Sequence, residues 1–440
     1  MADRRDRPYV GDYGQPMQGA GRIASASISM VLLACAIGFA VGVAVWGALS
    51  LSSLLVSLLW RGLPAVFPFD AWWLPLILCP LGGLLIGLWT RAFHSAPEPL
   101  DAVMGQVRAT GGYRLRGGAA SFVSFLLPLA FGGSIGPEAG LSGIIAAACT
   151  WIGRTLKRAG LKVKAVADLT VSATLSAVFG APFLGIVMNA ESQPRIPSPD
   201  DYALRRSAKL LLYTAAAFGA FGGAAAVSGL LGGNAGLPHF PSIQAAGAQL
   251  LLVVPLSLVG WALALLFHAS NHVFGALGAR FRDESILAPV IAGVALGAVA
   301  LALPGVLFSG EEQCRSIMGS WGAAGAFALI ATGIVKAVAT PLCLNLGWRG
   351  GNFFPCIFAG VSAGYGIATL VGIDPMLCVV SVTTAFVAGM TRKPVLSLAL
   401  LLLCFPIDGI LVSGVAAVVG AALPIPRALM VRKSDAAKAG

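Results

Sequence analysis

Apolar residues fill long runs along almost the whole 440-residue chain, and short polar or glycine-rich interruptions separate these runs. Runs such as 28–59, 210–231 and 376–422 hold few or no charged residues. A helix needs about 20 apolar residues to cross the hydrocarbon core of a bilayer. The longest runs must therefore hold more than one crossing, and some shorter ones only enter the membrane. The pattern predicts an all-α polytopic membrane protein with tilted and broken helices.

The composition agrees with this pattern, since 57% of the residues are hydrophobic, 11% are charged and the mean hydropathy is +0.86. These values exclude an ordinary soluble globular protein. The first apolar run is too long and begins too late for a signal peptide, so we expect the N-terminal tail to be retained. Both tails are basic, which predicts that both termini are cytoplasmic. We expect a multi-pass protein of the cell membrane.

The remaining polar features suggest no further chemistry. Orientation in the lipid bilayer explains the net charge of +11, and we expect no nucleic acid partner. The eight cysteines form no CxxC pair and are interpreted as small core residues. His268 and His272 have helical spacing but no third ligand nearby, so we predict no metal and no cofactor. The apolar runs hold neither a nucleophile with its base nor an HExxH pattern, so we do not expect an enzyme.

The chain repeats two short patterns in the same order. GGSIGP at 132–137 is matched by GGNFFP at 350–355, and APFLGIVM around Pro182 is matched by KPVLSLAL around Pro394. Two such matches predict homologous halves, which in transporters often have inverted topology and form the binding site at their interface. The predicted organisation is a cytoplasmic tail (1–22), a first membrane repeat (23–231), a connector (232–242), a second membrane repeat (243–430) and a second cytoplasmic tail (431–440).

The repeated Gly-Gly-x-x-x-Pro pattern predicts helices that begin inside the membrane. Glycine lets the backbone turn or approach a ligand closely, and proline suits the first turn of a helix. Such a helix start leaves N–H groups unpaired in hydrocarbon, where an anion can satisfy them together with the helix dipole. Two facing starts predict a selective site of low affinity, as conduction requires. The alternative is tight packing between helices through small residues, which leaves the matched prolines unexplained.

The halves, the motifs and their order resemble the CLC family of chloride channels and chloride/proton antiporters. The family patterns G-[KR]-E-G-P and G-x-F-x-P correspond to GSIGP and GNFFP, and the G-P-E version of the first motif is most similar to a divergent bacterial branch. The resemblance implies two inverted repeats of broken helices and a homodimer with one anion pathway per subunit. Ser95 is the nearest counterpart of a chloride-binding serine, or an N-cap in the capping box Ser95-x-x-Glu98. The anion-binding residues implied by the resemblance are Ser95, Ser134, Ile135, Gly136, Asn352, Phe353 and Phe354.

Departures from the family patterns bear on the mechanism. When GSIGP is aligned with G-[KR]-E-G-P, Ile135 stands where the family has its gating glutamate. Counting from APFLGI, Ser192, preceded by Glu191, stands where the antiporters have an inner proton-transfer glutamate. Isoleucine carries no proton, so the sequence favours passive, channel-like passage of chloride or a similar small anion. The alternative is a proton-coupled antiporter that uses a displaced carboxylate, either Glu138 or Glu191. A pathway for cations should show more acids in the repeats.

We also interpret four further charged positions. Arg349 directly precedes the second motif and either draws anions toward the pathway or lies at the membrane interface. Arg392 matches an arginine common in the family and is interpreted as structural. Glu311 and Glu312 are expected in a solvated loop.

Overall fold

The computed structural model describes residues 28–66, 71–93, 118–138, 173–174, 176–177, 206–232, 238–245, 247–281, 285–402, 404–426 and 429. Within these ranges the regular elements are helices, and one isolated antiparallel bridge joins Gly136 to Gly351. The prediction of an all-α protein is thereby confirmed.

The described α-helices follow the apolar runs of the sequence. In chain order they are α1 (Ile28–Ser57), α2 (Leu63–Val66), α3 (Pro75–Phe93), α5 (Gly118–Ala130), α9 (Arg206–Leu231), α10 (Val253–Gly278), α11 (Leu287–Ala302), α12 (Glu311–Ser320), α13 (Ala326–Asn345), α14 (Phe353–Val371), α15 (Pro375–Thr391), α16 (Pro394–Leu401) and α17 (Ile410–Ala422). A π-helical turn, Leu58–Gly62, joins α1 to α2. The short 3₁₀-helices are η2 (Ala71–Trp73), η5 (Gly247–Leu252), η6 (Pro304–Val306), η7 (Trp321–Ala323) and η8 (Ile407–Gly409).

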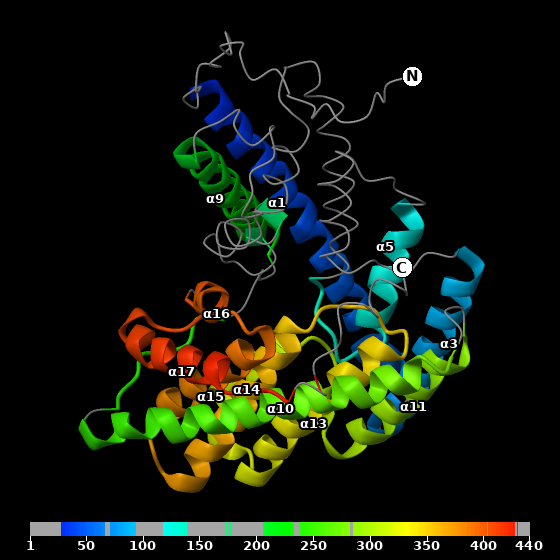
Figure 1. Ribbon diagram of the computed structural model, residues 1–440. Coiled ribbons are helices and arrows are strands. Elements are labelled where there is room, and N and C mark those ends of the chain that lie inside the picture. Colours follow the sequence, from blue (N-terminus) through cyan, green and yellow to red (C-terminus); the bar gives the residue numbers. More distant parts are fainter. Residues whose placement is uncertain are drawn as a thin grey trace, which may run out of the picture.

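Small residues bring neighbouring helices close together. α1 and α9 lie side by side (Figure 1), and a side chain at Gly38 would collide with the backbone of Ala216. α3 and α11 pack in the same way, because Gly83 lies against the backbone of Pro289. This kind of contact suits helices in lipid, where close backbone packing replaces the hydrophobic effect as the main attraction. The α3–α11 contact also joins the two sequence halves.

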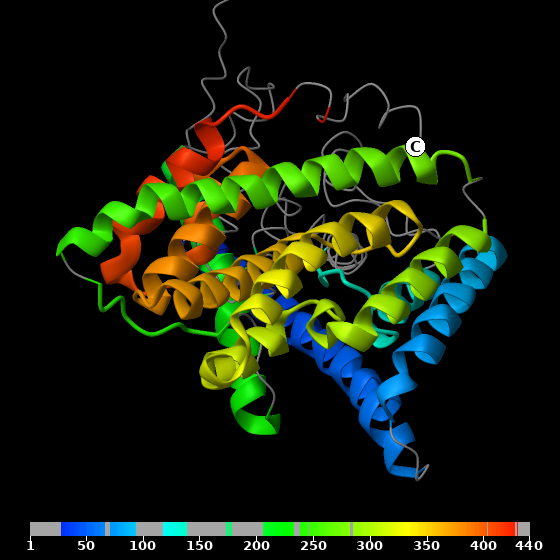
Figure 2. The same cartoon turned by 90° about the horizontal axis from the view of Figure 1, so that it is seen from below.

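α14 and α15 form the centre of a bundle with α10, α13 and α17. α13 packs on α14, while α10 and α17 pack on α15, and in Figure 2 α10 runs across this bundle as one long helix. Almost every residue of α14 up to Gly366, and of α15 up to Met390, is buried. The start of α14 is therefore enclosed by other helices, which decides the environment of any ion that binds there.

Six stretches of the described chain are long and apolar enough to cross a membrane. They are Ile28–Ala65, Pro75–Phe93, Leu210–Leu231, Gly247–Gly278, Ala326–Asn345 and Phe353–Val371. Large apolar side chains point outward on several of the helices, including Leu251 at 79% exposed and Leu411 at 80% exposed. A lipid environment explains such exposure, and the expectation of a multi-pass membrane protein is confirmed.

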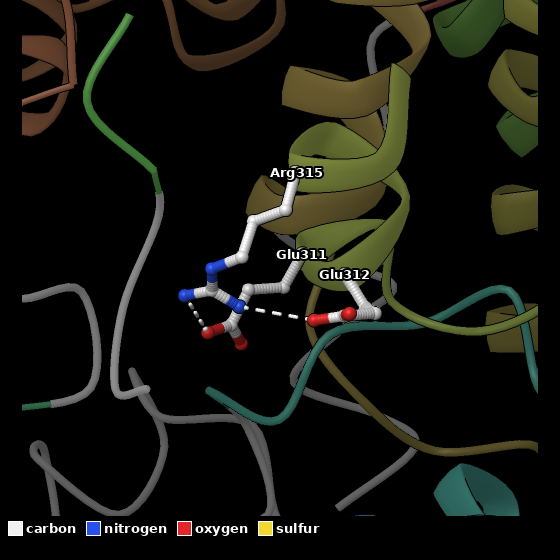
Figure 3. Close-up of polar contacts among 3 residues, drawn as sticks. All are labelled: Glu311, Glu312 and Arg315. Carbon is white, nitrogen blue, oxygen red and sulfur yellow. Dashed lines mark hydrogen bonds and ion pairs between the residues drawn. The ribbon is translucent and has the colours of Figure 1, made fainter. Parts of the chain in front are cut away.

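The acidic pair before α13 does not lie in a loop. Glu311 and Glu312 form the first turn of α12, which begins after Gly310 in a left-handed conformation with φ of 100°. Arg315 forms ion pairs with Glu311 at 3.2 Å and with Glu312 at 3.3 Å (Figure 3). Acids in the first turn and a base one turn later both stabilise a short helix, so the loop expectation was wrong. Glu312 is still solvent-exposed, as predicted.

Candidate anion-binding site

The two repeated motifs meet in space. After α5 the chain turns at Gly132, with φ of 87°, and continues without regular structure, through a bend at Ser134, to Gly136. The N–H of Gly136 donates to the carbonyl of Gly351 at 2.8 Å, and the N–H of Gly351 donates back to Gly136 at 2.7 Å. Because each segment supplies a hydrogen-bond partner for the other, the irregular backbone after α5 and before α14 can be tolerated inside the membrane.

The second motif starts a helix, as the sequence predicts. Asn352 is the residue before α14, and Phe353 and Phe354 open its first turn with Pro355. The side chain of Asn352 does not cap the helix. The first amides of α14 therefore need an acceptor from elsewhere in the protein or from a bound anion.

That acceptor is the carboxylate of Glu138. Its Oε1 accepts the N–H of Phe353 at 2.7 Å, and the amide of Phe354 also interacts with the carboxylate. The side chain is only 5% exposed, and Oε2 has no hydrogen-bond partner within the described part of the chain. A negative charge is favourable at the positive end of a helix, so Glu138 occupies the place where the sequence predicts an anion.

Glycine is required on both sides of this carboxylate. A Cβ at Gly136 would collide with the carboxylate oxygens of Glu138, and a Cβ at Gly351 would collide with the Cγ and Cδ of the same side chain. The two glycines that form the backbone bridge thus also leave the space that Glu138 fills. The glycines of the motifs serve close approach here, as the sequence suggests.

The other predicted residues of the first motif lie in an apolar setting. Ile135 is fully buried, and a Cβ at Gly350 would collide with its side chain. The hydroxyl of Ser134, also fully buried, lies 3.3 Å from the hydroxyl of Thr340 on α13. Within the described residues, the carboxylate that reaches the second motif comes from Glu138, three positions after Ile135.

The carboxylate that contacts α14 thus comes from Glu138, three positions beyond Ile135. The signal was present in the sequence as an intramembrane carboxylate directly after a glycine and a proline. The contact with Phe353, which lies 215 positions further on, was visible only in the fold.

Several predicted positions contribute nothing to this view. Ser95 and Glu191 lie outside the described residues. Arg349 is exposed just before the second motif. Arg392 donates from its guanidinium to the carbonyl of Leu423, which agrees with the structural role expected for it.

The sequence analysis missed one buried charge near the site. Lys336 lies in the middle of α13 and is fully buried. Its signal was a single lysine within an apolar run of the length of a membrane span.

Comparison with known proteins assigns the fold and the family. In a search of solved structures, a slow cyanobacterial Cl⁻/H⁺ antiporter superimposes with a TM-score of 0.74 at 17% identity, covering 92% of this chain and 97% of that one. A CLC-type fluoride/proton antiporter superimposes with a TM-score of 0.69 at 18% identity, covering 90% and 96%. A eukaryotic CLC transporter gives a TM-score of 0.66 at 17% identity, covering 90% and 72%. The fold is therefore that of the CLC transporters.

Sequence comparison leads to the same family. The chloride channel protein CLC-f of Arabidopsis thaliana is 25% identical over 393 residues, which cover 82% of this chain and 47% of the plant protein. The chain thus spans about half the length of the curated relative that it matches. The family model described as voltage gated chloride channel matches residues 82–424, a range that includes both repeated motifs. Since this range covers most of the chain, the protein belongs to the voltage gated chloride channel family, that is, the CLC family.

Proposed function

We propose that this protein is a carboxylate-gated anion transporter, in which chloride or a similar small anion competes with Glu138 for the first amides of α14. The observation that carries the proposal is the 2.7 Å hydrogen bond from the N–H of Phe353 to Oε1 of Glu138. A carboxylate oxygen and a halide both accept hydrogen bonds and both carry negative charge. An anion can therefore take this place only after the side chain has moved away.

Protonation of Glu138 is the simplest way to release the site. A protonated carboxyl group has lost the charge that favours the positive end of α14, and it carries a proton of its own to donate. Proton binding and anion binding then favour each other, as linked equilibria must. The geometry thus favours the proton-coupled alternative over the passive passage inferred from Ile135. Two of the structural relatives are described as proton antiporters, which agrees with this mechanism.

The family also suggests the setting of the protein. We propose a homodimer in the cell membrane, with both termini cytoplasmic and one anion pathway in each subunit. The basic tails support the orientation, and the outward-facing apolar side chains support contact with lipid and with a second copy.

The test is anion flux through the purified protein in liposomes. Chloride-loaded liposomes are diluted into low chloride at neutral and at acidic pH, and chloride efflux and external pH are recorded together. We expect faster efflux at acidic pH and an external pH that rises as protons enter. Glu138→Gln should abolish both the pH dependence and the proton movement, because glutamine cannot carry the charge or the proton.

The control and the contrary results are equally definite. Glu312→Gln makes the same change at an exposed carboxylate of α12 and should behave as the wild type. Unchanged pH dependence in Glu138→Gln contradicts the gate. Chloride efflux from the wild type without any proton movement contradicts proton coupling and supports passive, channel-like passage instead.

A further inference from the structure

A second buried charge lies close to the proposed site. The ammonium of Lys336 donates to the carbonyls of Gly305, Val306, Leu307 and Phe308, at 3.3, 3.1, 3.0 and 2.9 Å. The side chain is 0% exposed, and its Nζ also lies 5.1 Å from the ring centroid of Phe358. η6 and the two residues after it therefore wrap a set of backbone oxygens around one cation.

These neighbours favour the protonated form of the side chain. Every hydrogen-bond partner of Nζ is an acceptor, and an ammonium has three protons and no lone pair to satisfy. The aromatic face of Phe358 favours a cation as well. Among the described residues no carboxylate forms an ion pair with Lys336, so the carbonyl dipoles stabilise its charge without cancelling it. Within the described residues, the positive charge at this point is therefore not balanced by a carboxylate.

Contacts with α14 place this charge near its first turns. Phe358 lies five residues beyond Phe353, about 7.5 Å along a helix axis. Lys336 thus contacts the second turn of α14 through Phe358, while Glu138 holds the amide of Phe353 in the first turn. Among the described residues the two charges form no direct pair.

Lys336 is also linked to the first motif through the backbone. Phe308, whose carbonyl accepts from Lys336, donates its own N–H to the carbonyl of Gly132 at 3.1 Å. One turn after Lys336 on α13, Thr340 contacts Ser134. Through these contacts the position of the ammonium is fixed relative to the first motif.

We propose that Lys336 is the fixed positive charge that sets the affinity of the α14 site for small monovalent anions and excludes cations from it. The inference rests on the proposed function, because it concerns the same site. A helix terminus supplies only about half an elementary charge. A full charge in surroundings of low dielectric acts over a longer range than it would in water. In this scheme Lys336 does not touch the anion. It is a positioning residue that attracts the anion through the electrostatic field of its charge.

The competing view is that Lys336 only anchors the turn at 305–308. Two substitutions separate the views. Lys336→Gln removes the charge but keeps two N–H donors for the carbonyls, whereas Lys336→Arg keeps the charge but changes the shape of the donor group. A structural anchor should tolerate glutamine better than arginine, and a fixed charge should show the reverse order.

The experiment is calorimetric titration of the purified full chain with sodium chloride in the Glu138→Gln background, where no carboxylate competes. We expect Lys336→Gln to weaken chloride binding about tenfold, and Lys336→Arg to stay within about threefold of the parent. The half-saturating chloride concentration for efflux should rise by the same factor in Lys336→Gln, with the maximal rate much less affected. Lys393→Gln, the same change at an exposed lysine, is the matched control.

Several outcomes would overturn the inference. Lys336→Gln that is folded by thermal unfolding and gel filtration, yet binds chloride like its parent, removes the role of the charge. Lys336→Arg that binds chloride as weakly as Lys336→Gln also removes the role of the charge. If Lys336→Gln does not fold, Lys336→Arg is compared with the parent, and a loss of chloride affinity well beyond about threefold contradicts the inference. If the parent protein binds and carries no anion at all, the proposed function has failed. Loss of the Glu138 effects alone, with the Lys336 effects present, removes the gate and leaves the fixed charge.

Discussion

Two buried charges lie near the start of α14, and backbone groups of opposite polarity hold them. Glu138 belongs to a short turn after the first motif and is held by the amide end of a helix, with Oε2 left without a partner in the described chain. Lys336 belongs to the middle of α13 and is surrounded by four carbonyls and an aromatic ring. Glu138 is thus held through one of its two carboxylate oxygens, whereas the ammonium of Lys336 is surrounded by its partners.

The difference suggests that one charge can leave its place and the other cannot. Glu138 loses its main attraction to α14 when it is neutralised, because the attraction is that of a charge to a helix end. Lys336 has no such release, since a neutral amine keeps only two N–H donors for four carbonyls in the membrane interior. A direct salt bridge between the two would cancel both charges and leave little attraction for an anion. In the proposed mechanism, separate backbone partners keep a movable negative charge at Glu138 and a fixed positive charge at Lys336.

Removal of each charge should therefore affect stability very differently. Lys336→Met keeps the length of the side chain but supplies no donors, and we expect it to cost about 3 kcal/mol of folding stability. Glu138→Gln keeps an acceptor for Phe353 and should cost less than about 1 kcal/mol. Thermal unfolding in detergent of the two variants side by side measures the contrast. Equal losses would mean that both charges are structural and would end the comparison.

The second prediction concerns the space around Glu138. Since a Cβ at Gly351 would meet the side chain of Glu138, Gly351→Ala should push the carboxylate away from Phe353. Chloride efflux at neutral pH should then rise about tenfold toward the rate of Glu138→Gln, which corresponds to a barrier lowered by about 1.4 kcal/mol. The control adds Gly351→Ala to Glu138→Ala, where little further change is expected. A fall in efflux in both backgrounds would show that Gly351 is needed for the backbone bridge alone.

Sequence reasoning predicted the parts of this site that depend on local pattern. The helix start at Phe353 followed from Gly-Gly-x-x-x-Pro, and the all-helical fold followed from the long apolar runs. Glu138 also stood out, because a carboxylate in such a run needs a reason. These features concern neighbouring residues, whose conformations are restricted by their own chemistry.

The parts that were missed depend on contacts between distant segments. Ile135 and Glu138 are both close to the glycine turn in sequence, and only the bridge between Gly136 and Gly351 determines which of them faces α14. Lys336 gave no sign of its partners, because backbone carbonyls carry no sequence signature. The expectation of a loop at Glu311 was wrong because the acidic pair was considered without its neighbours. Glu311 begins a helix of ten residues, and an ion pair with Arg315, one turn later, stabilises that helix.

The smallest expected effect tests whether the two charged regions communicate by contact or by field. Thr340 links the first motif to α13, with its hydroxyl 3.3 Å from that of Ser134 and donating to the backbone carbonyl of Lys336 at 3.0 Å. Thr340→Val keeps the shape and removes both contacts, and we expect a stability loss below about 1 kcal/mol, because the hydroxyl is bonded mainly to its own helix. Chloride affinity in the Glu138→Gln background should stay within about twofold, because the electrostatic attraction between Lys336 and the anion does not depend on the Thr340 hydroxyl. If calorimetric titration instead shows a loss as large as that of Lys336→Gln, then Lys336 acts by holding the first motif in place, and its charge matters only through that contact.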